Sequence, residues 1–363
     1  MTVSHRFHPL NVATVRAETG DALVISLMVP ETLRTVFTFQ PGQFITLRAD
    51  VDGADTRRSY SICSTPALLA NKGLVEIGVR VLADGLFSNW LAQKVSAGTI
   101  LQIMPPEGRF VSTVPKAMHR VGFAAGSGIT PILSLMMHSM QTEAHAKFSL
   151  VYGNQKMSSV MFNESLQDLK DSYPDRVTLI HILSRQSQEA DLLEGRIDTA
   201  KVQRLLDTLL PAKSMDEVFV CGPEGMIEST CQALADAGLP ANRVHAERFA
   251  SASTPKNSKR QTSNSQPNAE QAVALTLVLD GKTHALRMGH DEHILDVALT
   301  AGLDLPYSCR GGVCCTCRAK VTQGSVAMAK NFTLEKWETD QGFVLSCQSK
   351  PTSSAVALSF DER

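Results

Sequence analysis

Four of the chain's eight cysteines lie in the nine-residue stretch CRGGVCCTC, and a fifth stands alone thirty residues further on. Cys309, Cys314 and Cys317 are spaced as C-x4-C-x2-C, and Cys347 completes a set of four, which is the ligand spacing of a plant-type [2Fe-2S] cluster. The two glycines in the loop give its backbone the freedom to wrap an inorganic core with its N–H groups facing the sulfides. The spacing therefore predicts a [2Fe-2S] site with four thiolate ligands.

A structural zinc site is the alternative for these thiols. Zinc sites usually pair both sets of thiols as C-x2-4-C, whereas Cys347 stands alone in VLSCQS. Cys315 is the extra thiol, and it could replace Cys314 only by changing the intervals to x5 and x1. We therefore expect Cys314 to be a ligand and Cys315 to be a bystander that points the other way.

A second group of residues suits phosphate binding. In GFAAGSGITPIL, Gly126 and Gly128 separate a predicted buried strand from a helix that opens at Thr130. Glycines allow close backbone approach, and a helix N-terminus offers free N–H groups and a positive dipole end to a pyrophosphate. The segment Cys221-Gly222-Pro223 ends a later strand of the same predicted sheet, and ligands bind at the carboxyl ends of such strands. A glycine-rich turn alone could equally be structural, but the two together predict a nucleotide site.

Two further motifs combine cations, hydroxyls and aromatic rings. RRSYS contains Arg58, Tyr60 and Ser61, and GLFSNWL contains Gly85 and Ser88. By composition alone the first is equally a solvated strand and the second a short amphipathic helix.

The elements that must position these residues fall into three patterns. Up to about Val111, short β-rich runs such as FITLRA, LVEIGVRVL and TILQIMPP alternate with turn signals, which indicates a small antiparallel β-barrel. From Arg120 to Phe249 buried strands alternate with helical segments, such as FSLVYG before VMFNESLQDLK, and predict an α/β doubly wound parallel sheet. LTLVLDGKTHALRM then predicts a hairpin about Asp280-Gly281, and HILDVALTAG a short helix before the cysteines.

The segment between the last two patterns has no aromatic residue and no aliphatic side chain larger than alanine, so it cannot bury apolar surface. We expect a flexible linker over 251–271, between a barrel domain (1–112), an α/β domain (113–250) and a C-terminal domain (272–363). Such a linker would let the outer domains approach and separate.

The bulk composition excludes several classes of protein. With 363 residues, 43% hydrophobic and 20% charged residues and a net charge of -1, the chain has the composition of an ordinary multidomain globular protein and not of a nucleic-acid binder. No apolar run approaches the roughly 20 residues of a membrane span, and MTVSHRFHPL lacks the apolar core of a signal peptide. We expect the cytoplasm, where thiols stay reduced and a cysteine cluster indicates a metal or catalytic site.

The motifs resemble two known families. LPYSCRGGVCCTCRAKVTQGSVAM and GFVLSCQSKP resemble the plant-type ferredoxin domain, which implies an α+β β-grasp fold and a one-electron carrier from about residue 272 onward. RxYS, GxxS, GSGITP and CGPEGM occur in the order and approximate spacing of the ferredoxin-NADP reductase superfamily, over about residues 5–249. That resemblance implies an FAD-binding barrel followed by an NAD(P)-binding sheet.

The reductase resemblance also implies roles for single residues. Arg58, Tyr60 and Ser61 would hold the flavin's pyrophosphate and isoalloxazine, and the helix start at Gly85 and Ser88 would contact the FAD diphosphate. GSGITP resembles the nicotinamide-nucleotide pyrophosphate loop, and CGP would lie by the nicotinamide. The residues expected at the catalytic centre are Tyr60, Ser61, Cys221, Glu247 and Phe249, with the Phe249 ring near the flavin. A nucleophilic role for Cys221 is the alternative, but no histidine is close to it in sequence.

The choice between NADPH and NADH is predicted from the residues that follow the predicted strand VTLIHIL. Ser184 and Arg185 follow it, where related reductases place groups for the 2'-phosphate, and a guanidinium binds phosphate bidentately. No acidic residue for the ribose diol is evident after YGN. We therefore expect NADPH, with NADH as the alternative if Arg185 is only a solvated loop residue.

These parts define an electron path. A nicotinamide gives up two electrons in a hydride, whereas a [2Fe-2S] cluster accepts one at a time, and a flavin can take the pair and release it singly. The expected path runs from NADPH to FAD, to the cluster and out to a partner protein. We find no second metal motif and no substrate pocket in the sequence.

The acceptor follows only from resemblance. The domain order resembles reductase components of bacterial oxygenases, and YGNQKMSSVMFNESLQDLKDSYPDRVTLIHILSRQ, EADLLEGRID and NFTLEKWETDQGFVLSCQ resemble the reductase subunits of phenylacetyl-CoA epoxidases. This implies delivery to a di-iron oxygenase component in aerobic phenylacetate breakdown. The alternatives are an NADH-dependent reductase of a ring-hydroxylating or alkane oxygenase, and an iron-sulfur redox sensor. A sensor would need a DNA- or partner-binding element, and no helix-turn-helix or basic domain is recognisable in the sequence.

Overall fold

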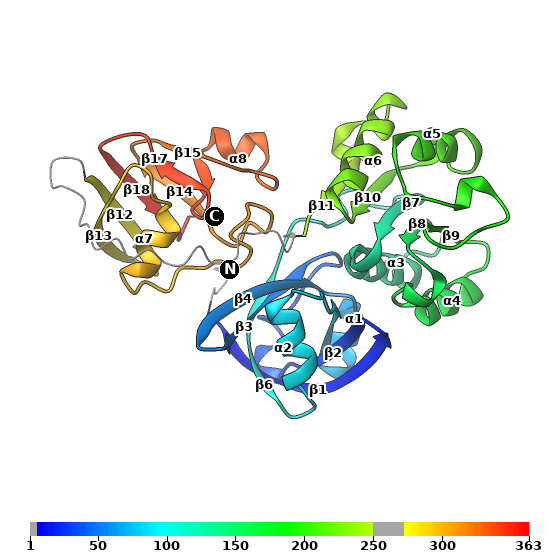
Figure 1. Ribbon diagram of the computed structural model, residues 1–363, viewed down its shortest axis with the longest axis horizontal. Helices are drawn as coiled ribbons and strands as arrows, with labels where there is room; N and C mark the ends of the chain where they lie inside the picture. The colour runs from blue at the N-terminus through cyan, green and yellow to red at the C-terminus, as the bar shows by residue number, and fades with distance from the viewer. Residues whose placement is uncertain (1–5, 250–271, 363) are drawn as a thin grey trace. The chain divides into compact units, whose positions relative to one another are not determined.

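The computed structural model of the chain describes residues 6–249 and 272–362, which belong to two compact units divided after Phe249 (Figure 1). The predicted linker, 251–271, lies outside the described residues. Within the two described ranges, no helix is long and apolar enough to cross a membrane.

The first unit opens with the predicted antiparallel barrel. Its six strands are ordered β4-β3-β6-β1-β2-β5, with Ile62 bridged to Ile77 where the two edge strands meet. The runs predicted as strands are β3, β5 and β6, and alternate side chains of these strands fill the barrel core. The strands are β1 (His8–Thr19), β2 (Ala22–Met28), β3 (Phe44–Val51), β4 (Ala54–Ser61), β5 (Leu74–Arg80) and β6 (Ile100–Glu107); the helices are α1 (Pro66–Lys72) and α2 (Leu86–Lys94).

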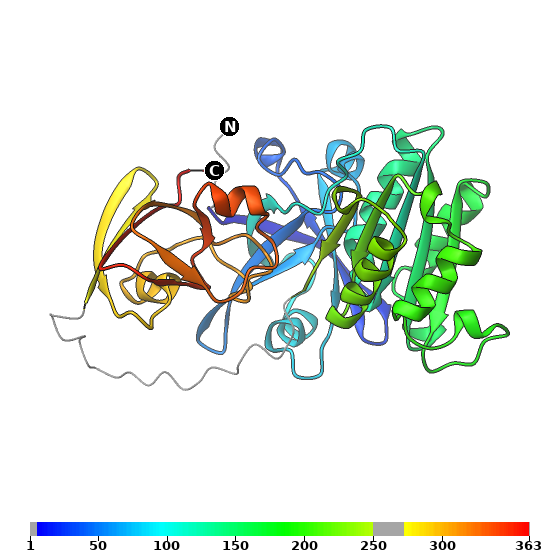
Figure 2. The same ribbon diagram turned by 90° about the horizontal axis from the view of Figure 1, so that it is seen from above.

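A parallel five-stranded sheet follows in the same unit, with helices on both faces (Figure 2). Along β8, Phe148 and Leu150 pack with α3 and α4, whereas Val151 packs with α5 and α6, as the two-residue period of a strand requires. The strand order is β11-β10-β7-β8-β9. The elements are β7 (His119–Ala125), α3 (Ile129–Thr142), β8 (Lys147–Asn154), α4 (Asn163–Ser172), β9 (Val177–Leu183), α5 (Thr199–Thr208), β10 (Glu217–Cys221), α6 (Glu224–Asp236) and β11 (Val244–Glu247).

The start of α4 differs from the prediction. The helical pattern of VMFNESLQDLK extends back to Val160, but the helix begins at Asn163 because Phe162 has a left-handed backbone, with a φ of 60°. The side chain of Phe162 is buried, and its N–H donates to Oε1 of Glu18 on β1 at 2.6 Å. Contact with the barrel thus overrides the helical pattern at this point.

A buried carboxylate joins the segment that follows the barrel to the parallel sheet. Glu217, at the start of β10, accepts hydrogen bonds from Ser112 Oγ (2.6 Å), the Thr113 N–H (2.6 Å), Arg120 Nε (3.1 Å) and His245 Nε2 (2.9 Å). Burial works to raise the pKa of Glu217, but the hydrogen bonds from His245, Ser112 and Thr113 lower it to about 2. The ionised carboxylate therefore ties β7, β10 and β11 to one another and to residues 112–113.

The second unit is a mixed sheet with helices packed against it, in agreement with the predicted β-grasp fold. Strands β12 and β18 pair in parallel, whereas β12 and β13 form the predicted hairpin, with positive φ at Asp280 (51°) and Gly281 (72°). The sheet order is β13-β12-β18-β14-β16, and β15 pairs separately with β17. The elements are β12 (Val273–Leu279), β13 (Lys282–Met288), α7 (Ile294–Thr300), β14 (Arg318–Gln323), β15 (Val326–Met328), α8 (Lys336–Asp340), β16 (Phe343–Leu345), β17 (Ser349–Pro351) and β18 (Ala355–Ser359).

Candidate functional site

Strand β4 gives its two neighbouring arginines different surroundings. Arg57 is buried, lies 3.2 Å from Asp55 and stacks over the Phe7 ring at 5.0 Å. Arg58 points to the other side of the strand and is exposed. Arg58 is therefore the guanidinium of this pair that is open to solvent, and its contact with the flavin pyrophosphate stays a prediction.

The RxYS and GxxS motifs meet on one side of the barrel. The rings of Tyr60 on β4 and Phe87 on α2 stack with centroids 6.3 Å apart. Ser88 is buried and holds the turn before α2, because its Oγ accepts from the Leu82 N–H (3.2 Å) and donates to the Gly85 carbonyl (3.2 Å). A Cβ at Gly85 would lie 2.4 Å from Ser88 Oγ, so this turn requires glycine. Ser88 thus shapes the entrance to the helix N-terminus.

The two glycine-rich segments of the parallel sheet also meet. The short 3-10 helix η2 (Gly126–Gly128) joins β7 to α3, and a Cβ at Gly128 would lie 2.1 Å from the carbonyl oxygen of Cys221. Thr130 is buried, and its hydroxyl donates to the Ser127 carbonyl at 3.0 Å, so it stabilises the turn. Gly222 follows Cys221 directly, and Pro223 is the N-cap of α6. Both segments therefore form one surface at the carboxyl end of the sheet.

Two residues beside the η2 turn escaped the sequence analysis. Tyr152 is fully buried on β8, and its hydroxyl donates to the Gly126 carbonyl at 2.9 Å. Arg80, at the end of β5, donates to the Ser159 carbonyl at 2.9 Å, and its Nη1 lies 3.3 Å from the position of a Cβ on Gly126. Tyr152 could have been suspected from its place two residues before the end of a buried strand, whereas no local signal marks Arg80.

Three of the five predicted catalytic residues, Ser61, Cys221 and Glu247, come together from three strands. Ser61 Oγ donates to Oε2 of Glu247 at 3.1 Å, and Glu247 on β11 pairs in register with Cys221 on β10. Tyr60 precedes Ser61 on β4, and Phe249, with 40% of its side chain exposed, lies two residues beyond Glu247.

Burial shifts the pKa values of Glu247 and Cys221. Burial raises the pKa of Glu247 to about 8, although the hydrogen bond from Ser61 opposes the shift. Burial also raises the pKa of the Cys221 thiol well above its ordinary value. Cys221 is therefore a protonated thiol at neutral pH, which argues against the nucleophile alternative.

Ser184 and Arg185 follow β9 beside the end of β8. The Ser184 N–H donates to the Asn154 carbonyl and the Arg185 N–H to the Gln155 carbonyl, both at 2.9 Å. The Arg185 side chain is exposed. The structure thus fixes the backbone of this pair and leaves the guanidinium accessible at the carboxyl edge of the sheet.

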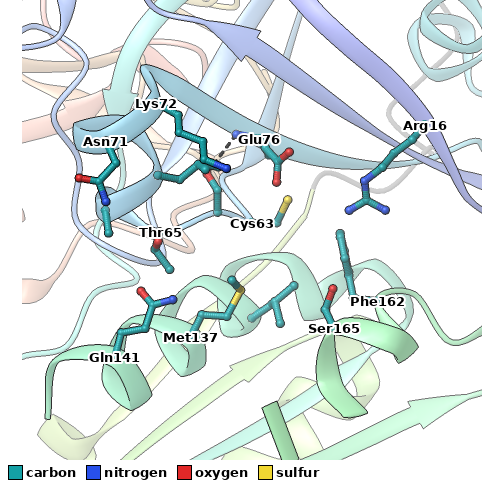
Figure 3. A pocket seen from close by; sticks show the side chains of 14 residues that line it. Arg16, Cys63, Thr65, Asn71, Lys72, Glu76, Met137, Gln141, Phe162 and Ser165 are labelled. Atoms are coloured by element: carbon teal, nitrogen blue, oxygen red, sulfur yellow. Dashed lines mark hydrogen bonds between the residues drawn. The ribbon is translucent and has the colours of Figure 1, made fainter. Parts of the chain in front are cut away.

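A cavity of about 340 Å³ lies elsewhere in the first unit, between α1 and β5 on one side and α3 and α4 on the other (Figure 3). Cys63, Glu76, Met137 and Phe162 are among the side chains that line it. Among its described lining residues, none is a predicted flavin, nucleotide or catalytic residue. The cavity is therefore distinct from the surface that joins Ser61, Glu247 and the glycine-rich segments.

In the second unit the four predicted ligands form two pairs. The thiols of Cys309 and Cys314 are hydrogen bonded, as are those of Cys317 and Cys347. In each pair the hydrogen bond lowers the pKa of the accepting thiol, Cys309 or Cys347, and raises that of its partner. The chain therefore gathers two thiol pairs.

Donors and a tight loop surround these sulfurs. The Gly311 N–H lies 3.3 Å from Cys309 Sγ, and Gln348 Nε2 lies 3.6 Å from Cys347 Sγ. Gly312 has a φ of 79°, which lets the loop turn back on itself.

These features suit a [2Fe-2S] cluster better than zinc. Two thiolate pairs match two irons with two cysteine ligands each, and the N–H donors face the sulfurs. The arrangement of the four thiols in two pairs therefore favours the [2Fe-2S] cluster over zinc.

Cys315 contacts a residue outside both pairs. Its sulfur is 2.6 Å from Thr333 Oγ1, and its backbone is left-handed, with a φ of 57°. This contact supports its interpretation as a bystander.

Three family matches define the class of protein. Residues 10–112 match the oxidoreductase FAD-binding domain, residues 123–232 the oxidoreductase NAD-binding domain and residues 277–352 the 2Fe-2S iron-sulfur cluster binding domain. The protein is an oxidoreductase of FAD, a nicotinamide nucleotide and a [2Fe-2S] cluster.

Full-length relatives narrow the class. The chain is 40% identical to a subunit of the 1,2-phenylacetyl-CoA epoxidase of Escherichia coli (strain K12), over 98% of each chain. It is 34% identical to the ferredoxin reductase component of 3-ketosteroid-9-alpha-monooxygenase from Rhodococcus rhodochrous, over 97% of this chain and 96% of the relative. The solved structure of phthalate dioxygenase reductase has the same fold, with a TM-score of 0.59 and 20% identity over 98% of each chain. The chain belongs to the family of reductase components of oxygenase systems, which pass electrons through FAD and a [2Fe-2S] cluster to an oxygenase component.

Proposed function

We propose that this reductase takes electrons from NADPH and delivers them to the di-iron oxygenase component of a phenylacetyl-CoA epoxidase, in aerobic phenylacetate breakdown. The observation that carries the proposal is the 40% identity to the epoxidase subunit over 98% of both chains. The ketosteroid reductase component, at 34%, supports the alternative of another oxygenase.

Turnover with purified oxygenase components tests this assignment. With equal concentrations of reductase, we expect product from phenylacetyl-CoA with the phenylacetyl-CoA oxygenase subunits, and at least tenfold less turnover with a 3-ketosteroid oxygenase component. A reductase that supports the ketosteroid system equally well, or fails to support the epoxidase, contradicts the assignment.

The barrel would hold FAD on the side where its two motifs meet. The exposed Arg58 guanidinium and the first turn of α2 supply positive charge and N–H groups for a diphosphate, and the Tyr60 ring stacks on Phe87 of that helix. Bound FAD would supply the exchange of a hydride for two single electrons. Phe249, exposed at the end of the sheet, has an aromatic face suited to covering a flavin ring.

Ser61 and Glu247 provide a site for a proton next to this surface. A hydride carries a proton in addition to two electrons, so single-electron delivery leaves one proton to be removed. Ser61 Oγ can pass a proton to Oε2 of Glu247, 3.1 Å away. With a pKa of about 8, Glu247 is suited to hold and release a proton near neutral pH.

The nucleotide would lie on the surface shared by η2 and the CGP segment. Gly128 allows this close approach, and the N-terminus of α3 faces the pyrophosphate position. The exposed Arg185 guanidinium at the same sheet edge supports 2'-phosphate recognition and hence NADPH.

Replacing Arg185 with alanine tests the nucleotide preference. A charge-assisted hydrogen bond contributes roughly 1.5–3 kcal/mol, so we expect the KM for NADPH to rise at least tenfold and that for NADH to change less than about twofold. Steady-state kinetics with a dye acceptor measures both constants. Arg204→Ala is the matched control, because Arg204 is also an exposed arginine but lies on α5. An unchanged NADPH-to-NADH ratio in Arg185→Ala removes Arg185 from the 2'-phosphate site.

A further inference from the structure

The cavity between the barrel and the parallel sheet has two unlike walls (Figure 3). Its barrel wall carries two cations and one anion, from Arg16 on β1, Lys72 at the end of α1 and Glu76 on β5. Its sheet wall is largely apolar, with Met137 on α3 and Phe162 directly before α4. At about 340 Å³ the cavity has the size of a site for a small organic molecule. The two walls suit a ligand with charged groups at one end and an apolar body at the other.

The carboxylate of the barrel wall is half engaged. Oε1 of Glu76 accepts from Ser26 Oγ at 2.6 Å, which holds the carboxylate in place. Oε2 of Glu76 makes no hydrogen bond or ion pair with another described residue of the first unit. One carboxylate oxygen is therefore left to accept from a donor in the cavity.

The two cations of the barrel wall are held differently. One oxygen of Glu18 accepts from Arg16 Nη1 at 2.5 Å and the other from the Phe162 N–H at 2.6 Å. Lys72 forms no ion pair and no side-chain hydrogen bond with another residue of 6–249. Since Glu18 offsets the charge of Arg16, one positive charge on Lys72 and one negative charge on Glu76 remain to be paired. A ligand that pairs both carries one charge of each sign.

A buried hydroxyl lines the same cavity. Thr65 is 4% exposed and is the N-cap of α1, but its Oγ1 makes no capping hydrogen bond and has no other partner within 6–249. Ser64, beside it, is satisfied, because its Oγ accepts from the Glu76 N–H at 3.0 Å. The side-chain amides of Asn71 and Gln141 also line the cavity (Figure 3). A buried polar group without a partner is destabilising, so a molecule in the cavity is expected to supply one to Thr65.

We propose that this cavity binds a small zwitterion with an apolar side chain, of the class of the apolar α-amino acids. The ammonium group of the ligand donates to Oε2 of Glu76, its carboxylate accepts from Lys72 and the Thr65 hydroxyl, and its side chain packs against Met137 and Phe162. A simple anion would leave Glu76 unpaired, and a simple cation would leave Lys72 unpaired. The inference goes beyond the proposed function and is independent of the flavin, the nucleotide and the oxygenase.

Isothermal titration of the full-length holoprotein with matched probes tests the inference. The probes are L-phenylalanine, 3-phenylpropanoate, which lacks the ammonium group, and 2-phenylethylamine, which lacks the carboxylate. Hydrogen bonds between charged groups are the strong ones, so we expect each truncated probe to bind at least tenfold more weakly than L-phenylalanine. L-leucine and L-methionine, which keep both charged groups and an apolar side chain, are titrated alongside.

Two variants assign the charged groups. Lys72→Met should weaken binding of L-phenylalanine at least tenfold and remove its advantage over 2-phenylethylamine. Glu76→Gln should instead remove its advantage over 3-phenylpropanoate. Lys94→Met is the matched control and should bind L-phenylalanine as the wild type does, because Lys94 ends α2 as Lys72 ends α1 but does not line the cavity.

Absence of binding of all three amino acids at millimolar concentration would mean a cavity filled only with solvent and would overturn the proposal. Tighter binding of either truncated probe than of L-phenylalanine would also overturn it, as would binding that neither Lys72→Met nor Glu76→Gln changes. If Glu76→Gln does not fold, Lys72→Met decides, because Lys72 is exposed. Unchanged affinity of that variant for L-phenylalanine would then overturn the proposal.

Discussion

Cys309→Ser is expected to reduce electron delivery to the oxygenase component at least hundredfold, while NADPH oxidation with ferricyanide stays within about twofold of wild type. Cys309 is one of four thiols gathered in two pairs, and serine offers a harder and less acidic ligand to iron. The flavin and nucleotide motifs lie in the other compact unit, so a small dye can still accept electrons from that part of the chain. Stopped-flow or steady-state assays with both acceptors measure the two activities.

Cys315→Ser is the matched control, because Cys315 lies in the same loop but contacts Thr333. It should retain two irons, two sulfides and both activities. Equal loss of both activities in Cys309→Ser would contradict transfer through separate flavin and cluster modules. A full cluster in Cys314→Ser would instead show that Cys315 can replace a ligand.

Glu247→Gln is expected to slow electron release from the NADPH-reduced protein roughly hundredfold, in the range typical for a lost general acid–base group. Glu247 is protonated below its pKa of about 8, so its proton-accepting form becomes populated as the pH rises through 8. The wild-type rate should therefore rise between pH 7 and pH 9 and then level off. Glutamine cannot take up the proton, so the variant should be slow and independent of pH over this range. Stopped-flow reoxidation by a one-electron acceptor measures both features.

Ser61→Ala should have a similar effect, because it removes the group that donates to Glu247 at 3.1 Å. Glu228→Gln, an exposed carboxylate on α6, is the control and should behave as wild type. Persistence of the inflection near pH 8 in Glu247→Gln would assign it to another group.

Local patterns predicted much of the fold. Strand β9 has the bounds expected from VTLIHIL, and the Asp280-Gly281 turn joins β12 to β13, because these features depend on neighbours in sequence. The start of α4 was predicted too early, since the left-handed Phe162 depends on a contact with Glu18.

The functional sites, like the fold, could be predicted where they depend on residues close in sequence and not where they depend on packing. Cysteine spacing encodes a ligand set within one loop plus one further residue, so it could be predicted. The contact between Ser61 and Glu247 joins residues 186 positions apart, and the family resemblance pointed to the two residues but not to their contact. The contact of Arg80 with the η2 turn likewise depends on packing between the barrel and the sheet.

The visible spectrum of the purified protein before and after NADPH, with iron and sulfide counted against FAD, tests the central claim most directly. We predict one FAD, two irons and two acid-labile sulfides per chain, and bleaching of both flavin and cluster absorption by NADPH. Zinc in place of iron, absence of labile sulfide, or a cluster that stays oxidised while the flavin is reduced would contradict the path from nucleotide through flavin to cluster.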